Sequence, residues 1–185
     1  MDSADAVGGA AGTGLKYFTE MKGIIVRLKP MFLGEAVTEI PAGTEAVWAV
    51  LTDFARYPEW ATFIRQIEGR AKPGTWLLVA EGPPGRHPYR VRVPIVEATP
   101  GVRLAWTPTL PGMPWLPAVM FSGVHEFILS ALPGGGTRLT QREHFSGLLS
   151  RLAKRNARWV APGFDTFNAA LKRRVLELAE ANSSL

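Results

Sequence analysis

The segment Val47–Trp60 constrains the fold of this 185-residue chain more than any other. It reads VWAVLTDFARYPEW and contains two Trp, one Phe and one Tyr within fourteen residues. Apolar positions one turn apart, after an acceptable N-cap at Thr44, predict a first short helix. Asp53 can cap a second, which we expect Tyr57-Pro58 to end, because the residue before a proline avoids helical dihedrals. Helices this short cannot bury themselves, so they must cover the edge of something larger.

Strand-like segments follow the helix pair in close succession. Apolar and polar residues alternate most regularly in 89–96, which suits a strand with one buried face. The expected strands are 63–68, 76–81, 89–96, 102–106, 121–132 and 137–145.

The C-terminal region is expected to be helical, because its apolar residues step by three and four positions. This stripe consists of Phe164, Phe167, Leu171, Val175 and Leu178. We expect the main helix to begin at Pro162, since proline is tolerated in a first turn, with a separate basic segment over 148–160 before it. The whole order predicts an α+β fold. An antiparallel sheet of six or seven strands wraps around one long C-terminal helix, with two short helices after the first strand.

The last two strands are expected to form a hairpin with faces of unequal polarity. A three-residue loop at 134–136 has a common hairpin geometry. It predicts three cross-strand pairs: Phe127 with Glu143, His125 with Phe145, and Leu129 with Gln141. A two-residue loop would shift the register by one and mix the polar and apolar faces.

Three polar residues, His125, Gln141 and Glu143, interrupt the apolar inner face of this hairpin. Unpaired buried polar groups cost about 1–3 kcal/mol each. They therefore satisfy one another in a structural network, or they line a hydrated or ligand-filled cavity. His125 is expected diagonally across from Glu143. Arg65 shares strand parity with apolar neighbours, so it is a candidate to point inward and pair with Glu143.

The order of a strand, a helix pair ending in Tyr-Pro-x-Trp (residues 57–60) and an antiparallel sheet resembles the START-like, polyketide cyclase/dehydrase (SRPBCC) superfamily. The resemblance runs from about Gly34 to the C-terminus. It implies the helix-grip fold, with a cavity between the sheet and the long helix. This superfamily includes enzymes, lipid carriers and chaperone-associated domains, so the resemblance is more specific for fold than for chemistry.

The first functional hypothesis is a binder of a hydrophobic small molecule such as a lipid, quinone or polyketide. The residues expected to contact the ligand are Trp60, Trp115, Phe127, Leu129, Gln141, Phe145, Phe164, Phe167 and Leu171. The second hypothesis is a cyclase/dehydrase-type enzyme whose catalytic residues are His125, Glu143 and Arg65. The proline-rich segment 107–117 is interpreted as a flap over the cavity mouth, or alternatively as a loop folded onto the core.

A third hypothesis is a protein- or membrane-interaction domain, because residues 151–185 contain seven basic and three acidic side chains. They carry +4 of the net charge of +5. A basic helix can contact an anionic membrane, but a solvated helix face accounts for the same charges. No nucleic-acid-binding module accompanies them, so no nucleic-acid partner is expected.

Composition places the chain among ordinary globular proteins, with 46% apolar and 20% charged residues. We expect a Gly- and Ala-rich extension without order over 1–20 and a single domain over 21–185. The chain has no cysteine, which excludes disulfides and thiol chemistry, and its acidic first residues do not resemble a secretory signal. A cytoplasmic protein is therefore expected. Its three scattered histidines predict no metal site, and no cofactor motif is present.

Overall fold

The computed structural model describes residues 20–21, 24–25, 31–82, 85–107, 120–150 and 154–183. Two very short strands come first and form a small sheet of their own: β1 (Glu20–Met21) and β2 (Ile24–Ile25). The remaining elements are β3 (Met31–Ile40), α1 (Thr44–Thr52), the 3₁₀ turn η1 (Phe54–Arg56), α2 (Tyr57–Trp60), β4 (Ile64–Glu68), β5 (Trp76–Glu81), β6 (Tyr89–Thr99), β7 (Arg103–Trp106), β8 (Ser122–Ala131), β9 (Thr137–Ser146) and α3 (Lys154–Ser183).

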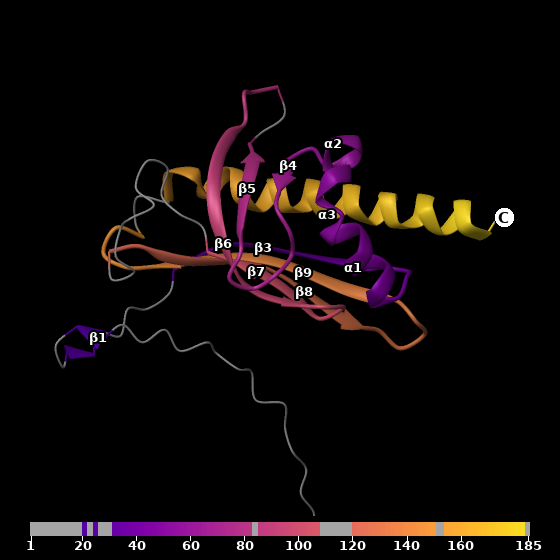
Figure 1. Cartoon of the computed structure of the whole chain (residues 1–185), viewed down its shortest axis with the longest axis horizontal. Helices are drawn as coiled ribbons and strands as arrows, with labels where there is room; N and C mark the ends of the chain where they lie inside the picture. The colour runs from indigo at the N-terminus through magenta and orange to yellow at the C-terminus, as the bar shows by residue number, and fades with distance from the viewer. Residues whose placement is uncertain are drawn as a thin grey trace, which may run out of the picture.

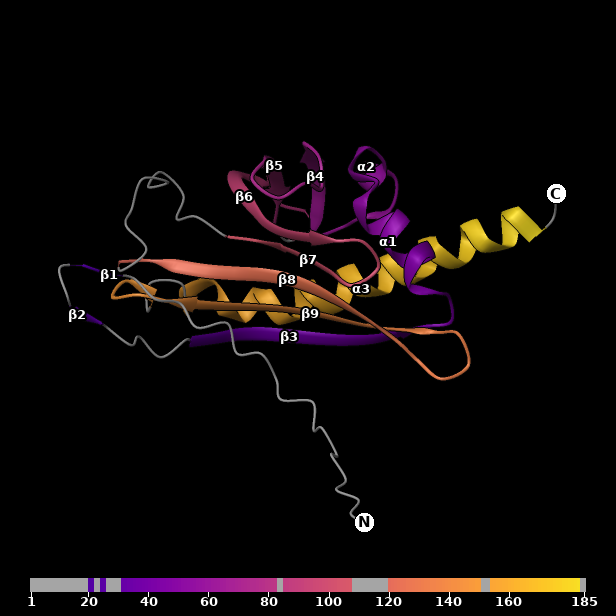
Figure 2. The same cartoon turned by 60° about the horizontal axis from the view of Figure 1, so that its bottom comes forward.

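Seven antiparallel strands form one sheet in the order β3-β9-β8-β7-β6-β5-β4. Figure 1 shows α3 running along this sheet, with α1 and α2 beside it. In Figure 2 the strands β4, β5 and β6 rise away from the plane of β3, β8 and β9, so the sheet curls around the helix. The expected α+β architecture, including two short helices after the first strand of the sheet, is confirmed. None of the described helices has the combination of length and apolar character that a membrane crossing requires.

Two prolines do not end or begin helices as expected. Pro58 lies in the first turn of α2, which continues to Trp60. A proline at this position loses nothing, because its missing N–H would have had no partner in the helix. Pro162 lies inside α3, which already begins at Lys154, so no separate segment precedes the main helix. The ring there removes one helical hydrogen bond, and the helix tolerates that loss.

The β8–β9 hairpin has a three-residue loop, as expected, but the loop is displaced by one residue. It consists of Pro133, Gly134 and Gly135, and Leu132 N–H donates to the Gly136 carbonyl at 2.8 Å. The displacement shifts the predicted pairs by two residues, so the structure pairs His125 with Glu143, Phe127 with Gln141, and Leu129 with Leu139. Proline has no N–H and cannot close the hairpin ladder, whereas Leu132 can. A shift of two keeps every side chain on its predicted face.

Helix α3 approaches the sheet closely at two glycines. A Cβ added to Gly34 of β3 would lie 3.2 Å from Ala161 Cβ, and one added to Gly163 would lie 2.6 Å from the Phe63 ring. The absence of side chains at both positions lets the helix backbone settle against β3 and the start of β4. The concave face of the sheet and the apolar stripe of α3 then share one core, in which Phe127 and Phe167 are fully buried.

Candidate functional site

His125 is the centre of a buried polar group on the inner face of β8 and β9. Its side chain is 3% exposed, and the Trp106 ring stacks on it with centroids 4.7 Å apart. Gln141 places Nε2 3.0 Å from His125 Nε2, and His125 Nδ1 lies 3.8 Å from Glu143 Oε1. An amide nitrogen only donates, so His125 Nε2 accepts this bond. His125 Nδ1 is then the ring nitrogen that faces Glu143.

Glu81 joins this group from the far side of the curled sheet. It is the last residue of β5, four places from β9 in the strand order, yet the charges of Glu143 and His125 act on its carboxyl group. Tyr89, directly opposite on β6, donates a 2.7 Å hydrogen bond to Glu81 Oε1. Strands so far apart in a flat sheet would hold their side chains well separated. The curl therefore brings the Glu81 carboxyl group within electrostatic range of Glu143 and His125.

The environment changes the acidity of two of these groups. Burial raises the pKa of the Glu81 carboxyl group and Glu143 raises it further, against the opposing effects of the Tyr89 hydrogen bond and His125. Tyr89 is 45% exposed, and partial burial together with the neighbouring Glu81 raises its pKa. A carboxyl group with a raised pKa keeps its proton to higher pH, so Glu81 is suited to donate a hydrogen bond or a proton.

Aromatic side chains from α2, α3 and β8 pack together beside this polar group. Phe164 meets the His125 ring edge-on at 5.0 Å between centroids, and Phe127 lies 5.5 Å from Phe167. Trp60 lies 5.3 Å from Phe167. All four aromatic residues are more than nine-tenths buried. The structure thus brings together most of the residues predicted to contact a ligand.

The other residues predicted to contact a ligand are distributed as follows. Leu129 and Leu171 belong to the same core, and the Phe145 ring lies tilted against Phe121 with centroids 4.9 Å apart. Trp115 lies outside the described residues, as does the predicted flap apart from Thr107. Ligand contact by any of these side chains stays a prediction.

Arg65 is placed on an irregular part of β4. The pairing of β4 with β5 shifts its register just after Ile64, so the simple alternation on which its inward direction was predicted does not hold there. Arg65 Nη2 donates to the Arg86 carbonyl at 2.9 Å and to the Gly82 carbonyl at 3.4 Å. Its pairing with Glu143 stays a prediction.

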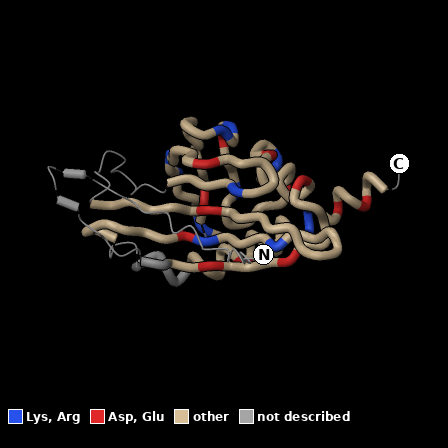
Figure 3. Tube along the Cα trace, turned by 90° about the horizontal axis from the view of Figure 1, so that it is seen from below, with Lys and Arg blue, Asp and Glu red and all other residues tan. Residues whose placement is uncertain are grey.

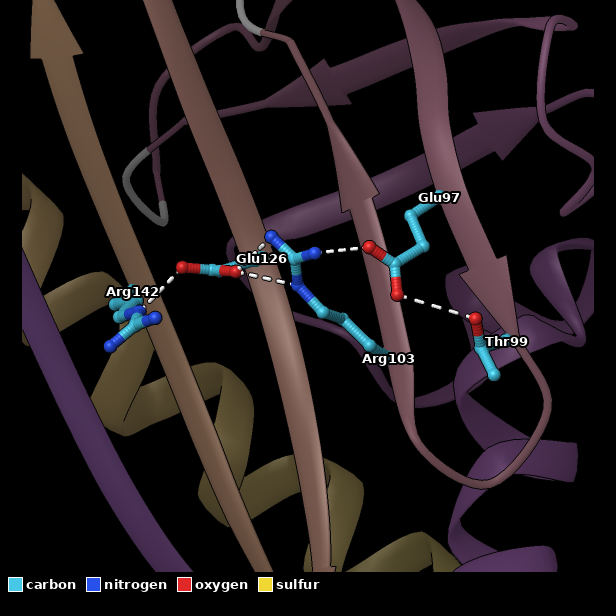
Figure 4. Close-up of polar contacts among 5 residues, drawn as sticks. All are labelled: Glu97, Thr99, Arg103, Glu126 and Arg142. Carbon is cyan, nitrogen blue, oxygen red and sulfur yellow. Dashed lines mark hydrogen bonds and ion pairs between the residues drawn. The ribbon is translucent and has the colours of Figure 1, made fainter. Parts of the chain in front are cut away.

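A second polar cluster lies on the opposite face of the sheet, which was predicted to be the wetter one. Glu126 of β8 is only 1% exposed and binds two arginines, Arg103 of β7 and Arg142 of β9. Arg103 also pairs with Glu97 of β6, which accepts a hydrogen bond from Thr99 (Figure 4). Each carboxylate is matched by a guanidinium group, so this cluster joins four neighbouring strands and is a structural one.

Sequence reasoning missed four residues of the concave site, and the same rules of spacing could have found them. Glu81 continues the alternation of the buried residues Leu77 and Val79. Tyr89 and Trp106 likewise share parity with buried residues of their strands, and Asn168 lies one turn after Phe164 on the buried stripe of α3. Within the part of the chain that the structure describes, no three His, Asp or Glu side chains are grouped as metal ligands.

Part of the basic C-terminal region is neutralised within the molecule. Arg173 and Arg174 pair with Glu177 at 3.7 and 3.8 Å, and Arg174 also pairs with Glu59 at 2.6 Å. The side chains of 151–159, which carry the other arginines of this region, lie outside the described set. In Figure 3 acidic and basic residues are interspersed over the described chain. Contact with an anionic membrane through this region stays a prediction.

The chain is similar to known proteins both in sequence and in fold. Residues 31–176 match the model of a family described as polyketide cyclase / dehydrase and lipid transport. The structure resembles a point mutant of norcoclaurine synthase from Thalictrum flavum in complex with a transition-state analogue, with a TM-score of 0.62 and 13% identity over 83% of this chain and 99% of that one. It also resembles a START superfamily protein from Mycobacterium smegmatis (TM-score 0.56, 16% identity, 78% and 97% coverage) and a protein from Mesorhizobium loti (TM-score 0.53, 23% identity, 77% and 96% coverage). Identities this low show a shared fold alone. No curated protein sequence matches the chain.

Proposed function

Because the chain belongs to the polyketide cyclase/dehydrase and lipid transport family, we propose that it binds a hydrophobic small molecule between the concave sheet and α3. The ligand would be a lipid, a quinone or a polyketide-like compound. The observation that carries the proposal is the polar group of Glu81, His125, Gln141 and Glu143, which interrupts an aromatic interior. Ligand sites combine mainly apolar walls with a few convergent polar groups of this kind.

The experiment is to purify the protein from cells and compare native mass spectra before and after delipidation. We expect an added mass that delipidation removes, and a rise in Tm when the delipidated protein meets apolar ligands. Protein that carries no ligand and shows no thermal shift across the whole panel would refute the proposal.

A pair of variants locates the site. Phe164→Leu changes a buried ring beside His125, whereas Leu178→Ala changes a side chain of the same helix that is 40% exposed. We expect Phe164→Leu to reduce ligand occupancy and Leu178→Ala to leave it unchanged. Equal occupancy in both variants would place the ligand elsewhere.

A second candidate function is a cyclase or dehydrase activity in the same interior, favoured by the raised pKa of Glu81 opposite Glu143. Two carboxyl groups whose environments differ can divide the work of acid and base. Glu143, with His125, would take a proton from a carbon between two ketones, and the carbanion would attack a second carbonyl carbon. Protonated Glu81 would give its proton to the alkoxide, and loss of water would follow.

Turnover of a poly-β-keto substrate tests this second candidate. We expect Glu143→Gln and His125→Ala to abolish turnover while both variants keep the circular dichroism spectrum of the parent protein. Unchanged turnover would exclude these two residues as acid–base groups and leave ligand binding as the function.

A further inference from the structure

Two fully buried oxygen atoms near the centre of the fold have no hydrogen-bond partner among the described residues. They are Oε1 of Gln141, on β9, and Oδ1 of Asn168, on α3. Both residues have 0% exposure, so neither oxygen is open to bulk solvent. An unsatisfied buried polar atom is rare in native proteins because it costs about 1–3 kcal/mol.

The two residues reach the same region from opposite sides of the core. Asn168 Nδ2 donates to the Ala36 carbonyl at 3.3 Å, and Ala36 is the residue of β3 directly opposite Gln141. Gln141 Nε2 already donates to His125. Each amide nitrogen thus donates a hydrogen bond to a protein group, while the amide oxygen has no partner among the described residues.

The Glu143 carboxyl group adds further acceptors, with Oε1 3.8 Å from His125 Nδ1. A third buried atom without a partner among the described residues, the indole Nε1 of Trp60 on α2, is a donor. Between β9 and α3, the buried acceptors without a partner among the described residues are therefore these two amide oxygens.

We propose that the molecule bound here is a hydrophobic compound bearing hydroxyl groups, which donate hydrogen bonds to Gln141 Oε1 and Asn168 Oδ1. This inference rests on the proposed binding function and specifies the ligand class. A carboxylate such as a free fatty acid brings only further acceptors, next to Glu143. Its burial would leave charges and oxygen atoms facing one another, which is costly.

Three probes of one ring system separate these chemistries: 2-naphthol, 2-methoxynaphthalene and 2-naphthoate. Their affinities are measured by displacement of the neutral dye Nile red from delipidated protein. We expect 2-naphthol to bind at least about tenfold more tightly than its methyl ether, which corresponds to one hydrogen bond of about 1.4 kcal/mol, and 2-naphthoate to bind most weakly.

Variants assign the preference to the two amides. Gln141→Met keeps the length of the side chain and removes the oxygen, and Asn168→Leu does the same on α3. Gln66→Met is the matched control, because Gln66 lies on β4 and hydrogen-bonds Glu68 at an exposed position. We expect the preference for 2-naphthol to fall several-fold in the first two variants and to persist in the control.

The outcomes distinguish this inference from the proposed function. If all three probes bind equally to the wild-type protein, as they would where a trapped water serves both oxygens, the hydroxyl preference is refuted and hydrophobic binding stands. A preference that survives both amide substitutions also refutes it. If Nile red and the three probes all fail to bind, the proposed function falls and this inference with it.

Discussion

Tyr57 anchors the helix pair through one buried hydrogen bond. Its side chain is fully buried, and its hydroxyl donates to the Leu51 carbonyl at 2.7 Å. Leu51 lies in the last turn of α1, where carbonyl groups have no partner within the helix. The tyrosine of the opening motif therefore completes the end of the preceding helix and also packs against Trp60 and Phe167.

Replacing Tyr57 with Phe should lower the free energy of unfolding by about 1–3 kcal/mol, because the Leu51 carbonyl stays buried without a donor. Urea denaturation measures the loss. Ser183→Ala is the control, since it removes an exposed hydroxyl that donates to the Ala179 carbonyl. Equal losses in the two variants would mean that burial of the carbonyl does not matter.

Glu81 should make stability depend on pH with a definite sign. Its pKa is raised in the folded protein, so stability is greatest while it is protonated and falls as the pH rises from the unfolded to the folded pKa. Glu81→Gln avoids this loss, because glutamine does not ionise. Its side-chain oxygen can still accept the hydrogen bond from Tyr89. We expect the variant to have a higher Tm than wild type at pH 8 and a similar Tm at pH 4.

The control for Glu81→Gln is Glu45→Gln, which removes an exposed acidic charge in the first turn of α1. It accounts for the change in net charge. If Glu81→Gln gains no stability at pH 8 relative to this control, ionisation of Glu81 carries no cost in the folded protein.

Among the elements, α3 depends most on close backbone contact. An alanine at Gly163 should gain about 1 kcal/mol of helix propensity, but its Cβ would lie 2.6 Å from the buried Phe63 ring. Overpacking of this kind costs about 1–3 kcal/mol. We therefore expect Gly163→Ala to destabilise the protein in urea denaturation, and less so in a Phe63→Leu background. A stabilised Gly163→Ala protein would show that the helix shifts without cost.

The strands β6 to β9 are joined across their outer face by the cluster around Glu126. Burial alone would raise the pKa of Glu126, but hydrogen bonds from Arg142 and Arg103 outweigh it and lower the pKa. The stabilisation is therefore present above the unfolded pKa and is lost as the pH falls through the folded one.

Glu126→Gln should cost about 2 kcal/mol at pH 7. This is less than the roughly 3–5 kcal/mol of a fully buried pair, because Arg103 and Arg142 are partly exposed. The difference from wild type should shrink below pH 4 in urea titrations. A constant difference across this range would show that charge is not the cause.

The elements also show why some details could not be predicted. Alternation and helical spacing identified every strand from β4 to β9 and the buried stripe of α3, because burial of one face imposes these periods. The end of α2, the start of α3 and the hairpin loop depended on prolines at 58, 162 and 133. The position of a proline in the sequence shows which backbone hydrogen bond is missing. Whether the helix or strand ends there depends on tertiary packing, which the sequence pattern does not contain.

At the scale of the whole molecule, the sequence predicted the part of the concave site that lies on the β8–β9 hairpin but not the part contributed by other elements. Parity within one hairpin placed His125, Gln141 and Glu143 on a common face. The approach of Glu81 from β5 required the curl of the complete sheet, which is a property of all seven strands together. The partnerless oxygen of Asn168 required the position of α3 over β3.

The pairing of β3 with β9 has a consequence for how the chain reaches its structure. Glu39 contacts Arg138, ninety-nine positions later, so the first strand of the sheet meets its partner only when most of the chain is available. Contacts this distant in sequence carry a large loop-closure entropy and slow the search for the native state. Stopped-flow refolding should accordingly take milliseconds to seconds, with β3 among the last strands to be protected from hydrogen exchange. Until β9 has been synthesised, β3 has no strand of this sheet to pair with.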